Sequence, residues 1–221
     1  MLLHRRQLVS AAVLAAPAVT TGLVRVRGAE TATTTPEGPK SSATPAETAA
    51  WKTPRTLGDA KAKNTVQEFF SLTCTHCAAF AQGTFPEVQK RLIDTGKVLW
   101  VFHDFPLDRV ALEAAMVARA LPPDRYEPFI AELFASQDRW AFATGINYTD
   151  ELWKMAALAG MNRATFDAAT GDTALRDWIL ARQSEDEKRY GIDATPTFLV
   201  NGQKHSGEMG YEEFAKLIPN A

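Results

Sequence analysis

Hydrophobic residues are distributed unevenly along this chain. An uncharged, mostly apolar run extends from Leu8 to Val24, and residues 30–54 then contain almost no large apolar side chain before Trp51. Regular alternation of apolar and polar positions begins only near Leu57. Because a segment of Thr, Ala, Pro, Ser and Glu cannot bury a core, we expect residues 30–54 to be a disordered leader. The pattern therefore predicts one folded domain over residues 55–221.

The folded domain opens with the pattern of a β-α-β unit. Residues 65–71 are rich in β-branched and aromatic side chains, and a second run of this kind follows Gly96 at residues 98–103. The intervening residues 78–94 have a helical pattern. Two strands joined in this way lie parallel in one sheet with a right-handed crossover, so this part of the chain predicts an α/β fold.

An all-helical block is expected next, from about residue 108 to about residue 190. Asp108 can cap a helix that Pro122-Pro123 ends, and Pro128 suits the first turn of the following helix. Further helices are expected at residues 149–160, 162–171 and 172–190, with Gly191 as the last stop signal.

The chain ends with a predicted β-β-α arrangement. Residues 195–200 are typical of a strand with proline near its start, and Asn201-Gly202 is a strong signal for a hairpin turn. Residues 203–206 would form the partner strand, and residues 211–218 have helical spacing.

Composition and charge narrow the class of protein. The chain has 221 residues, 46% hydrophobic and 23% charged, which is typical of a globular domain. The net charge is −2, yet Arg5, Arg6, Arg25 and Arg27 lie in the first 29 residues, where there is no acid. The remainder is therefore more acidic than the total indicates. A chain with this balance and no basic run is a poor candidate for a nucleic-acid-binding protein.

The N-terminus resembles a targeting segment rather than part of the fold. Residues 1–29 combine an early arginine pair with an apolar run, and Ala16-Pro17-Ala18 suits a cleavage site after Ala18. The pair Arg5-Arg6 also suits a twin-arginine signal as an alternative to ordinary secretion. An uncleaved membrane anchor is the remaining alternative, because Gln7 to Val24 nearly reaches the length of a membrane-spanning helix. We expect an exported, periplasmic protein.

The chemistry of the sequence is concentrated at Cys74-Thr75-His76-Cys77, directly after the first strand. These are the only 2 cysteines in the chain. A disulfide closing so short a loop adds little stability, so this spacing favours disulfide exchange over bracing. The start of a helix lowers the pKa of a thiol, and an imidazole at His76 would stabilise the thiolate further. We therefore expect Cys74 to be the nucleophile and Cys77 the resolving thiol of an oxidising pair.

Two structural interpretations of the cysteines compete with this one. A zinc site needs four ligands, and the chain has no cysteine outside the motif. Because His4 lies in the predicted signal segment, only His103 and His205 could complete such a site. A reduced, buried cysteine pair is the other alternative, because cysteine is common in protein cores. Neither histidine has partners at ligand spacing, so we expect no metal and no cofactor.

The motif and its surroundings resemble a known family. The run from Glu68 to Cys77, the segment from His103 to Asp108, and Thr195-Pro196-Thr197-Phe198 resemble DsbA-like thiol:disulfide oxidoreductases of the thioredoxin superfamily. The resemblance covers the chain from about Val66 to its C-terminus. It implies an α/β protein with a thioredoxin fold and an inserted helical domain at about residues 108–190.

The resemblance also implies roles for single residues. Pro196 would form a cis peptide bond against the cysteine pair, and the Thr195 backbone, with Thr75, would help to hold a peptide substrate. Glu68 would be the acidic residue that transfers protons to or from Cys77, the alternative being an exposed strand residue. The Thr75-His76 dipeptide differs from the Pro-His dipeptide of the best-known oxidases, and Ala194 stands where glycine is more usual.

These observations predict an exported oxidoreductase that exchanges disulfides with protein substrates, working as an oxidase. Its partners would be thiol-bearing proteins and a membrane redox protein that resets the cysteine pair, and the enzyme would be a monomer. The same residues would also serve a reductase or isomerase. A non-catalytic peptide-binding module or chaperone, using the groove near Pro196, is the alternative from a different class.

Overall fold

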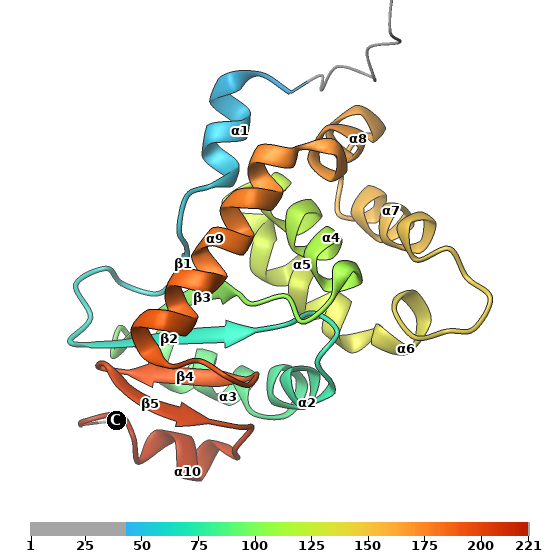
Figure 1. Cartoon of the computed structure of the whole chain (residues 1–221). Helices are drawn as coiled ribbons and strands as arrows, with labels where there is room; N and C mark the ends of the chain where they lie inside the picture. Colours follow the sequence, from blue (N-terminus) through green and yellow to red (C-terminus); the bar gives the residue numbers. More distant parts are fainter. Residues whose placement is uncertain (1–42, 221) are drawn as a thin grey trace, which may run out of the picture. The chain divides into compact units, whose positions relative to one another are not determined.

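The strands predicted from the sequence, together with an additional strand β1, form a single five-stranded sheet in residues 43–220, the part of the chain that the computed structural model describes (Figure 1). The strands lie in the order β1-β3-β2-β4-β5. β2 and β3 are parallel, as predicted, whereas β1, β4 and β5 pair antiparallel with their neighbours. The strand bounds are β1 Arg55–Leu57, β2 Asn64–Phe70, β3 Val98–Asp104, β4 Thr197–Val200 and β5 Gln203–Ser206.

The helices form two groups: those outside the segment between β3 and β4, and those inserted in that segment. The first group comprises α1 Pro45–Trp51, α2 Thr75–Gly83, α3 Phe85–Val88, the π-helix η1 Gln89–Ile93 and α10 Tyr211–Ala215. The inserted group comprises α4 Arg109–Ala120, α5 Pro123–Ala135, α6 Gln137–Trp140, α7 Tyr148–Leu158, α8 Arg163–Gly171 and α9 Thr173–Tyr190. The predicted α/β fold with an inserted helical block is confirmed. Figure 1 shows α9 returning along the sheet to β4.

An aromatic cluster fastens α2 to the sheet. Phe80 of α2 lies 4.6 Å from the Phe198 ring of β4 and 6.2 Å from the Trp100 ring of β3. Phe214 of α10 packs 5.7 Å from Trp100, and all four side chains are almost completely buried. Burying one large apolar side chain contributes about 1.5–3 kcal/mol. The start of α2 is therefore held rigidly relative to the ends of β2 and β4.

Two helix predictions need correction. Residues 78–94 are not one helix, because Thr84 separates α2 from α3 and the chain then widens into η1. Pro86 explains the break, since proline has no N–H to continue the hydrogen bonds of α2. Pro128 lies inside α5 rather than in its first turn, which Pro123 occupies. Pro128 and Asp124, whose carbonyl would accept the missing bond, are both exposed to solvent.

The predicted disordered leader is wrong over its last part. Thr44 caps α1 through a capping box with Glu47, and Trp51 at the end of α1 is only 5% exposed. The sequence pattern missed this helix because a single apolar side chain anchors it. The predicted signal peptide of residues 1–29, its cleavage after Ala18 and the leader up to residue 42 lie outside the described residues.

The remaining elements follow the sequence closely. Asn201 and Gly202 both have positive φ, at 50° and 87°, which the tight hairpin between β4 and β5 requires. Gly191 ends α9 in the left-handed conformation, as its position predicts. Among the described helices, none is long and apolar enough to cross a membrane.

Candidate active site

The two cysteines lie where β2 passes into α2. After Phe70 the chain makes a short turn, closed by the Cys74 N–H donating to the Ser71 carbonyl at 3.0 Å. Cys74 is the N-cap of α2, and its sulfur accepts a hydrogen bond from the Cys77 backbone N–H at 3.4 Å. Serine, threonine, asparagine and aspartate usually fill such a position because their side chains accept these free N–H groups. Here a thiol takes that place.

This position makes Cys74 acidic. The pKa of Cys74 is lowered to about 5, and a hydrogen bond from the Cys77 thiol is the largest cause. Thr195 and the N–H groups of Cys77 and His76 make smaller contributions. Burial of the sulfur opposes this change without cancelling it. At neutral pH the Cys74 sulfur is therefore mainly a thiolate, which is the reactive form.

Cys77 has the opposite character. Its side chain is completely buried, and burial raises the pKa of the Cys77 thiol far above its usual range. The hydrogen bond that the thiol donates to Cys74 and the negative charge there add to this effect. Both cysteines are free in this structure, so it describes the reduced pair. One sulfur is a thiolate and the other is a protonated donor to it.

Thr195 lies against Cys74 in the loop before β4, whose first residue pairs with Phe69 near the end of β2. The Thr195-Pro196 peptide bond is cis, as the resemblance implies. The Thr195 carbonyl lies 3.3 Å from the Cys74 sulfur and can accept a hydrogen bond from it only when the thiol is protonated, at pH below about 5. The Thr195 hydroxyl is buried and has no hydrogen-bond partner among the described residues in that state. Once Cys74 is ionised, this hydroxyl is available as a donor to the thiolate.

His76 points away from the place predicted for it. Its ring is 70% exposed, and Nδ1 lies 3.4 Å from a carboxylate oxygen of Glu208, in the loop after β5. The contribution of His76 to Cys74 is made by its backbone N–H. Thr75 is exposed at the first position of α2, beside the cysteine pair in sequence. A direct action of the His76 imidazole on the Cys74 sulfur stays a prediction.

Glu68 is buried beneath the pair. It is 4% exposed, so the alternative of an exposed strand residue is wrong. Burial raises the pKa of Glu68 to about 8, against a hydrogen bond at 3.1 Å from the Trp100 indole N–H to its carboxyl group. Its charge in turn raises the pKa of Cys77. A carboxyl group that titrates near neutral pH can give or take a proton at Cys77.

Sequence patterns missed two contacts of the turn before α2. The side-chain amide of Gln137 donates to the carbonyls of Leu72 and Cys74, at 2.7 and 3.1 Å. The Thr73 hydroxyl donates to Asp108, the N-cap of α4, at 2.6 Å. Asp108 was recognisable as a helix cap, whereas no sequence signal points from α6 to this turn.

The other two histidines of the described residues lie outside this site. His103 Nδ1 lies 3.0 Å from an oxygen of the buried Asp186 carboxyl group, and His205 pairs with Phe198 across the β4-β5 hairpin. Within residues 43–220, no group of three or more His, Cys, Asp or Glu side chains is arranged to hold a metal ion.

Comparison with known proteins gives a consistent result. A family model described as Thioredoxin matches residues 50–220. A putative protein-disulfide oxidoreductase of Rickettsia typhi is 30% identical over 147 residues, covering 66% of this chain and 54% of that protein. The chain thus spans about half the length of this curated relative. Disulfide bond formation protein D of Bacillus subtilis is 26% identical over 179 residues, covering 73% of this chain and 74% of that protein.

Among solved structures, alpha-DsbA1 of Wolbachia pipientis superimposes with a TM-score of 0.70 and 33% sequence identity. The match covers 75% of this chain and 88% of that chain.

Proposed function

This chain belongs to the thioredoxin family, with DsbA proteins among its structural relatives, and we propose that it is a thiol:disulfide oxidoreductase acting on protein substrates. The predicted thioredoxin fold with an inserted helical domain is confirmed by the same membership. The observation that carries the proposal is the unequal acidity of the two thiols. Cys74 is ionised at neutral pH, whereas Cys77 is protonated and buried beside it.

In the proposed oxidation, the enzyme starts with a Cys74–Cys77 disulfide. A substrate thiolate attacks the Cys74 sulfur, the disulfide breaks, and Cys77 leaves as a thiolate that takes up a proton. A second substrate thiolate attacks the substrate sulfur of the mixed disulfide, and Cys74 leaves as a thiolate. The substrate loses two electrons in forming its disulfide, and the enzyme gains them as a reduced pair.

The proton at Cys77 is the task proposed for Glu68. When Cys77 leaves as a thiolate in a buried position, that charge is costly until a proton arrives. The pKa of Glu68, about 8, makes this carboxyl group mainly protonated at neutral pH and therefore able to supply one. In the reverse step the same carboxylate removes the proton, so that Cys77 can attack.

The direction of exchange follows from the thiolate. A low pKa at Cys74 stabilises the reduced enzyme and makes its disulfide a stronger oxidant. A pKa of about 5 lies between the values of about 3.5 in a strong oxidase and about 7 in a reducing thioredoxin. We infer that oxidation is the main direction. A reductase or isomerase is the second candidate, because the pKa of Cys74 lies above that of the strong oxidase.

The substrate site proposed here consists of the exposed Thr75 and of Thr195 and Pro196. An extended substrate segment would lie along the Thr195 backbone, as an added strand beside the cysteine pair. The proposed setting is the periplasm, reached through the predicted N-terminal signal or with that segment kept as an anchor. A membrane redox partner would reoxidise the pair, and the enzyme would act as a monomer.

The test is the oxidative refolding of a reduced substrate protein by the oxidised enzyme. The wild-type chain should transfer its disulfide, and Cys74→Ser should abolish transfer because no sulfur remains for attack. Starting from the reduced enzyme and an oxidised substrate, Cys77→Ser should accumulate a mixed disulfide through Cys74, visible by mass spectrometry.

Either of two results would contradict the proposal. One is refolding by Cys74→Ser at the wild-type rate, and the other is a wild-type chain that neither oxidises nor exchanges. In the second case a non-catalytic peptide-binding module becomes the better description, and substrate binding should then survive Cys74→Ser.

A further inference from the structure

The turn that carries Cys74 is gripped by a side chain from the inserted domain. Gln137 of α6 is 6% exposed and donates both side-chain N–H groups to backbone carbonyls, at 2.7 Å to Leu72 and 3.1 Å to Cys74. One residue separates Leu72 from Cys74. An amide that donates to both of their carbonyls fixes the backbone between them. This residue therefore constrains the segment that sets the direction of the Cys74 side chain.

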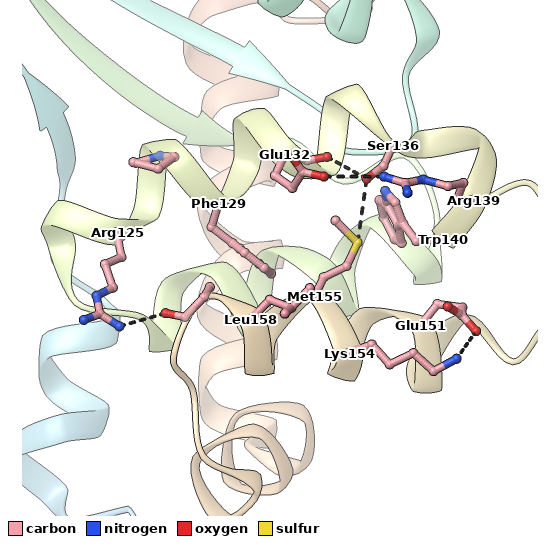
Figure 2. Close-up of a pocket in the computed structure, with 12 residues that line it drawn as sticks. Arg125, Phe129, Glu132, Ser136, Arg139, Trp140, Glu151, Lys154, Met155 and Leu158 are labelled. Atoms are coloured by element: carbon pink, nitrogen blue, oxygen red, sulfur yellow. Dashed lines mark hydrogen bonds and ion pairs between the residues drawn. The ribbon is translucent and has the colours of Figure 1, made fainter.

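The helix that carries Gln137 is itself well anchored. Figure 2 shows Ser136 and Trp140, on either side of this residue, packed between α5 and α7. The buried Trp140 indole donates to the Leu133 carbonyl at 2.8 Å, and the Ser136 hydroxyl lies 3.8 Å from the Met155 sulfur. Because α6 is held in this way, the backbone position of Gln137 is fixed. Its hydrogen bonds therefore hold the turn in one conformation.

A second contact holds the same turn from the start of α4. Thr73 donates to one oxygen of Asp108, and the other oxygen caps α4 by accepting from the Ala111 N–H at 2.8 Å. The Ser71 hydroxyl lies 3.2 Å from the Thr73 hydroxyl and accepts from the Leu107 N–H at 3.3 Å. The inserted domain therefore contacts the turn at its middle and at both flanking carbonyls.

Resting on the function proposed above, we propose that Gln137 is a positioning residue for disulfide exchange: it holds residues 72–74 so that the Cys74 sulfur faces the first N–H groups of α2. The Cys77 N–H reaches that sulfur at 3.4 Å, and a rotation of the turn would carry the sulfur away from this donor. This orientation favours the ionised sulfur, so the inserted domain acts on the chemistry of a residue it does not carry.

The test replaces Gln137 by methionine, which keeps the length of the side chain and removes both donors. We measure the pH midpoint of Cys74 alkylation and the equilibrium of the cysteine pair with glutathione. The midpoint should rise by about one unit, a tenfold loss of thiolate below it, and the disulfide should become less oxidising. Gln137→Asn, one methylene shorter, keeps a polar group in the site and should shift both values in the same direction.

The matched control is Gln82→Met. Gln82 also links α2 to the inserted domain, through a hydrogen bond at 3.2 Å to the Phe134 carbonyl, but at the far end of α2 from Cys74. It should leave the midpoint unchanged. An unchanged midpoint in folded Gln137→Met or Gln137→Asn overturns the inference, as does an equal shift in Gln82→Met. The alkylation midpoint is measured without any substrate, so this result stays separate from a failure of the wild-type chain to exchange disulfides.

Discussion

At the scale of single residues, the acidity of Cys74 and the basicity of Cys77 have one common origin. Cys74 caps a helix and accepts from the N–H groups there, whereas Cys77 is three residues later, inside the first turn and without solvent. The same thiol-to-thiolate hydrogen bond lowers the pKa of Cys74 and raises the pKa of Cys77. The order of the cysteines along the chain therefore decides which one reacts first.

Thr195→Val tests the hydroxyl that faces this thiolate. Valine has nearly the shape of threonine but lacks the hydroxyl, so a donor available to the ionised sulfur is lost while the Thr195 carbonyl contact is kept. We expect the pKa of Cys74 to rise, by roughly 1–2 units for one hydrogen bond to a charged group. The measurement is the pH dependence of Cys74 alkylation.

Thr170→Val is the control for that substitution. The Thr170 hydroxyl is partly buried and donates to the Phe166 carbonyl within α8. The substitution therefore removes a similar hydroxyl away from the cysteines. Equal alkylation profiles for Thr195→Val and the wild-type chain would show that the hydroxyl does not act on the thiolate.

Only some residues of the site could be predicted from the sequence alone. The cysteine pair and the proline could be recognised because their chemistry lies in short local patterns. Gln137 and Glu208 could not, because each reaches the site from a distant part of the chain. The spacing that identified His76 says nothing of the direction of its ring, which a carboxylate in the loop after β5 determines.

At the scale of elements, one buried ion pair joins α4 to the sheet and to the segment before it. The Arg119 guanidinium pairs with Asp104 at the end of β3 and donates to the carbonyls of Trp51 and Thr53 at 3.2 and 3.1 Å. The Tyr126 hydroxyl donates to the other oxygen of Asp104 at 2.9 Å. These bonds bring α1, β3, α4 and α5 to one point.

Arg119→Met should therefore destabilise the protein strongly. It leaves the buried Asp104 carboxylate without its cationic partner and two carbonyls of the α1-β1 connection without a donor. The expected loss is about 3–5 kcal/mol in the free energy of unfolding, measured by urea denaturation.

The control is Arg182→Met, which removes an arginine that is half exposed and pairs only with Glu185 in the described chain. A surface pair of this kind contributes about 0–1 kcal/mol. A loss no larger in Arg119→Met than in Arg182→Met would contradict the role of this ion pair as an anchor.

The same contacts explain which elements the sequence could predict. β2, β3 and the helices from α7 to α9 carry their own apolar patterns and caps, so local reasoning found them. α1, β1 and α6 are short, with too few apolar positions to form a pattern. α1 and β1 are held through Trp51 and Arg55, which both hydrogen-bond to the distant Arg119, and α6 is held by the buried Trp140.

At the scale of the whole molecule, the redox pair lies where three parts of the chain meet. The sheet supplies the buried Glu68, the loop before β4 supplies Thr195 and Pro196, and the inserted helices grip the turn before α2. The thioredoxin fold alone would provide the first two. The inserted domain adds hydrogen bonds to the turn that carries the reactive cysteine, so we expect it to influence the reactivity of Cys74.

We expect Cys74 to be a thiolate at neutral pH and its disulfide consequently to be oxidising. The most direct measurement is the rate of Cys74 alkylation against pH, together with the equilibrium of the pair against glutathione. Because the thiolate is the reactive form, the alkylation rate should fall as the pH drops through a midpoint near 5. The equilibrium should lie on the oxidising side of about −200 mV. A midpoint near the free-thiol value of about 8.5, with a potential near −270 mV, would contradict the account.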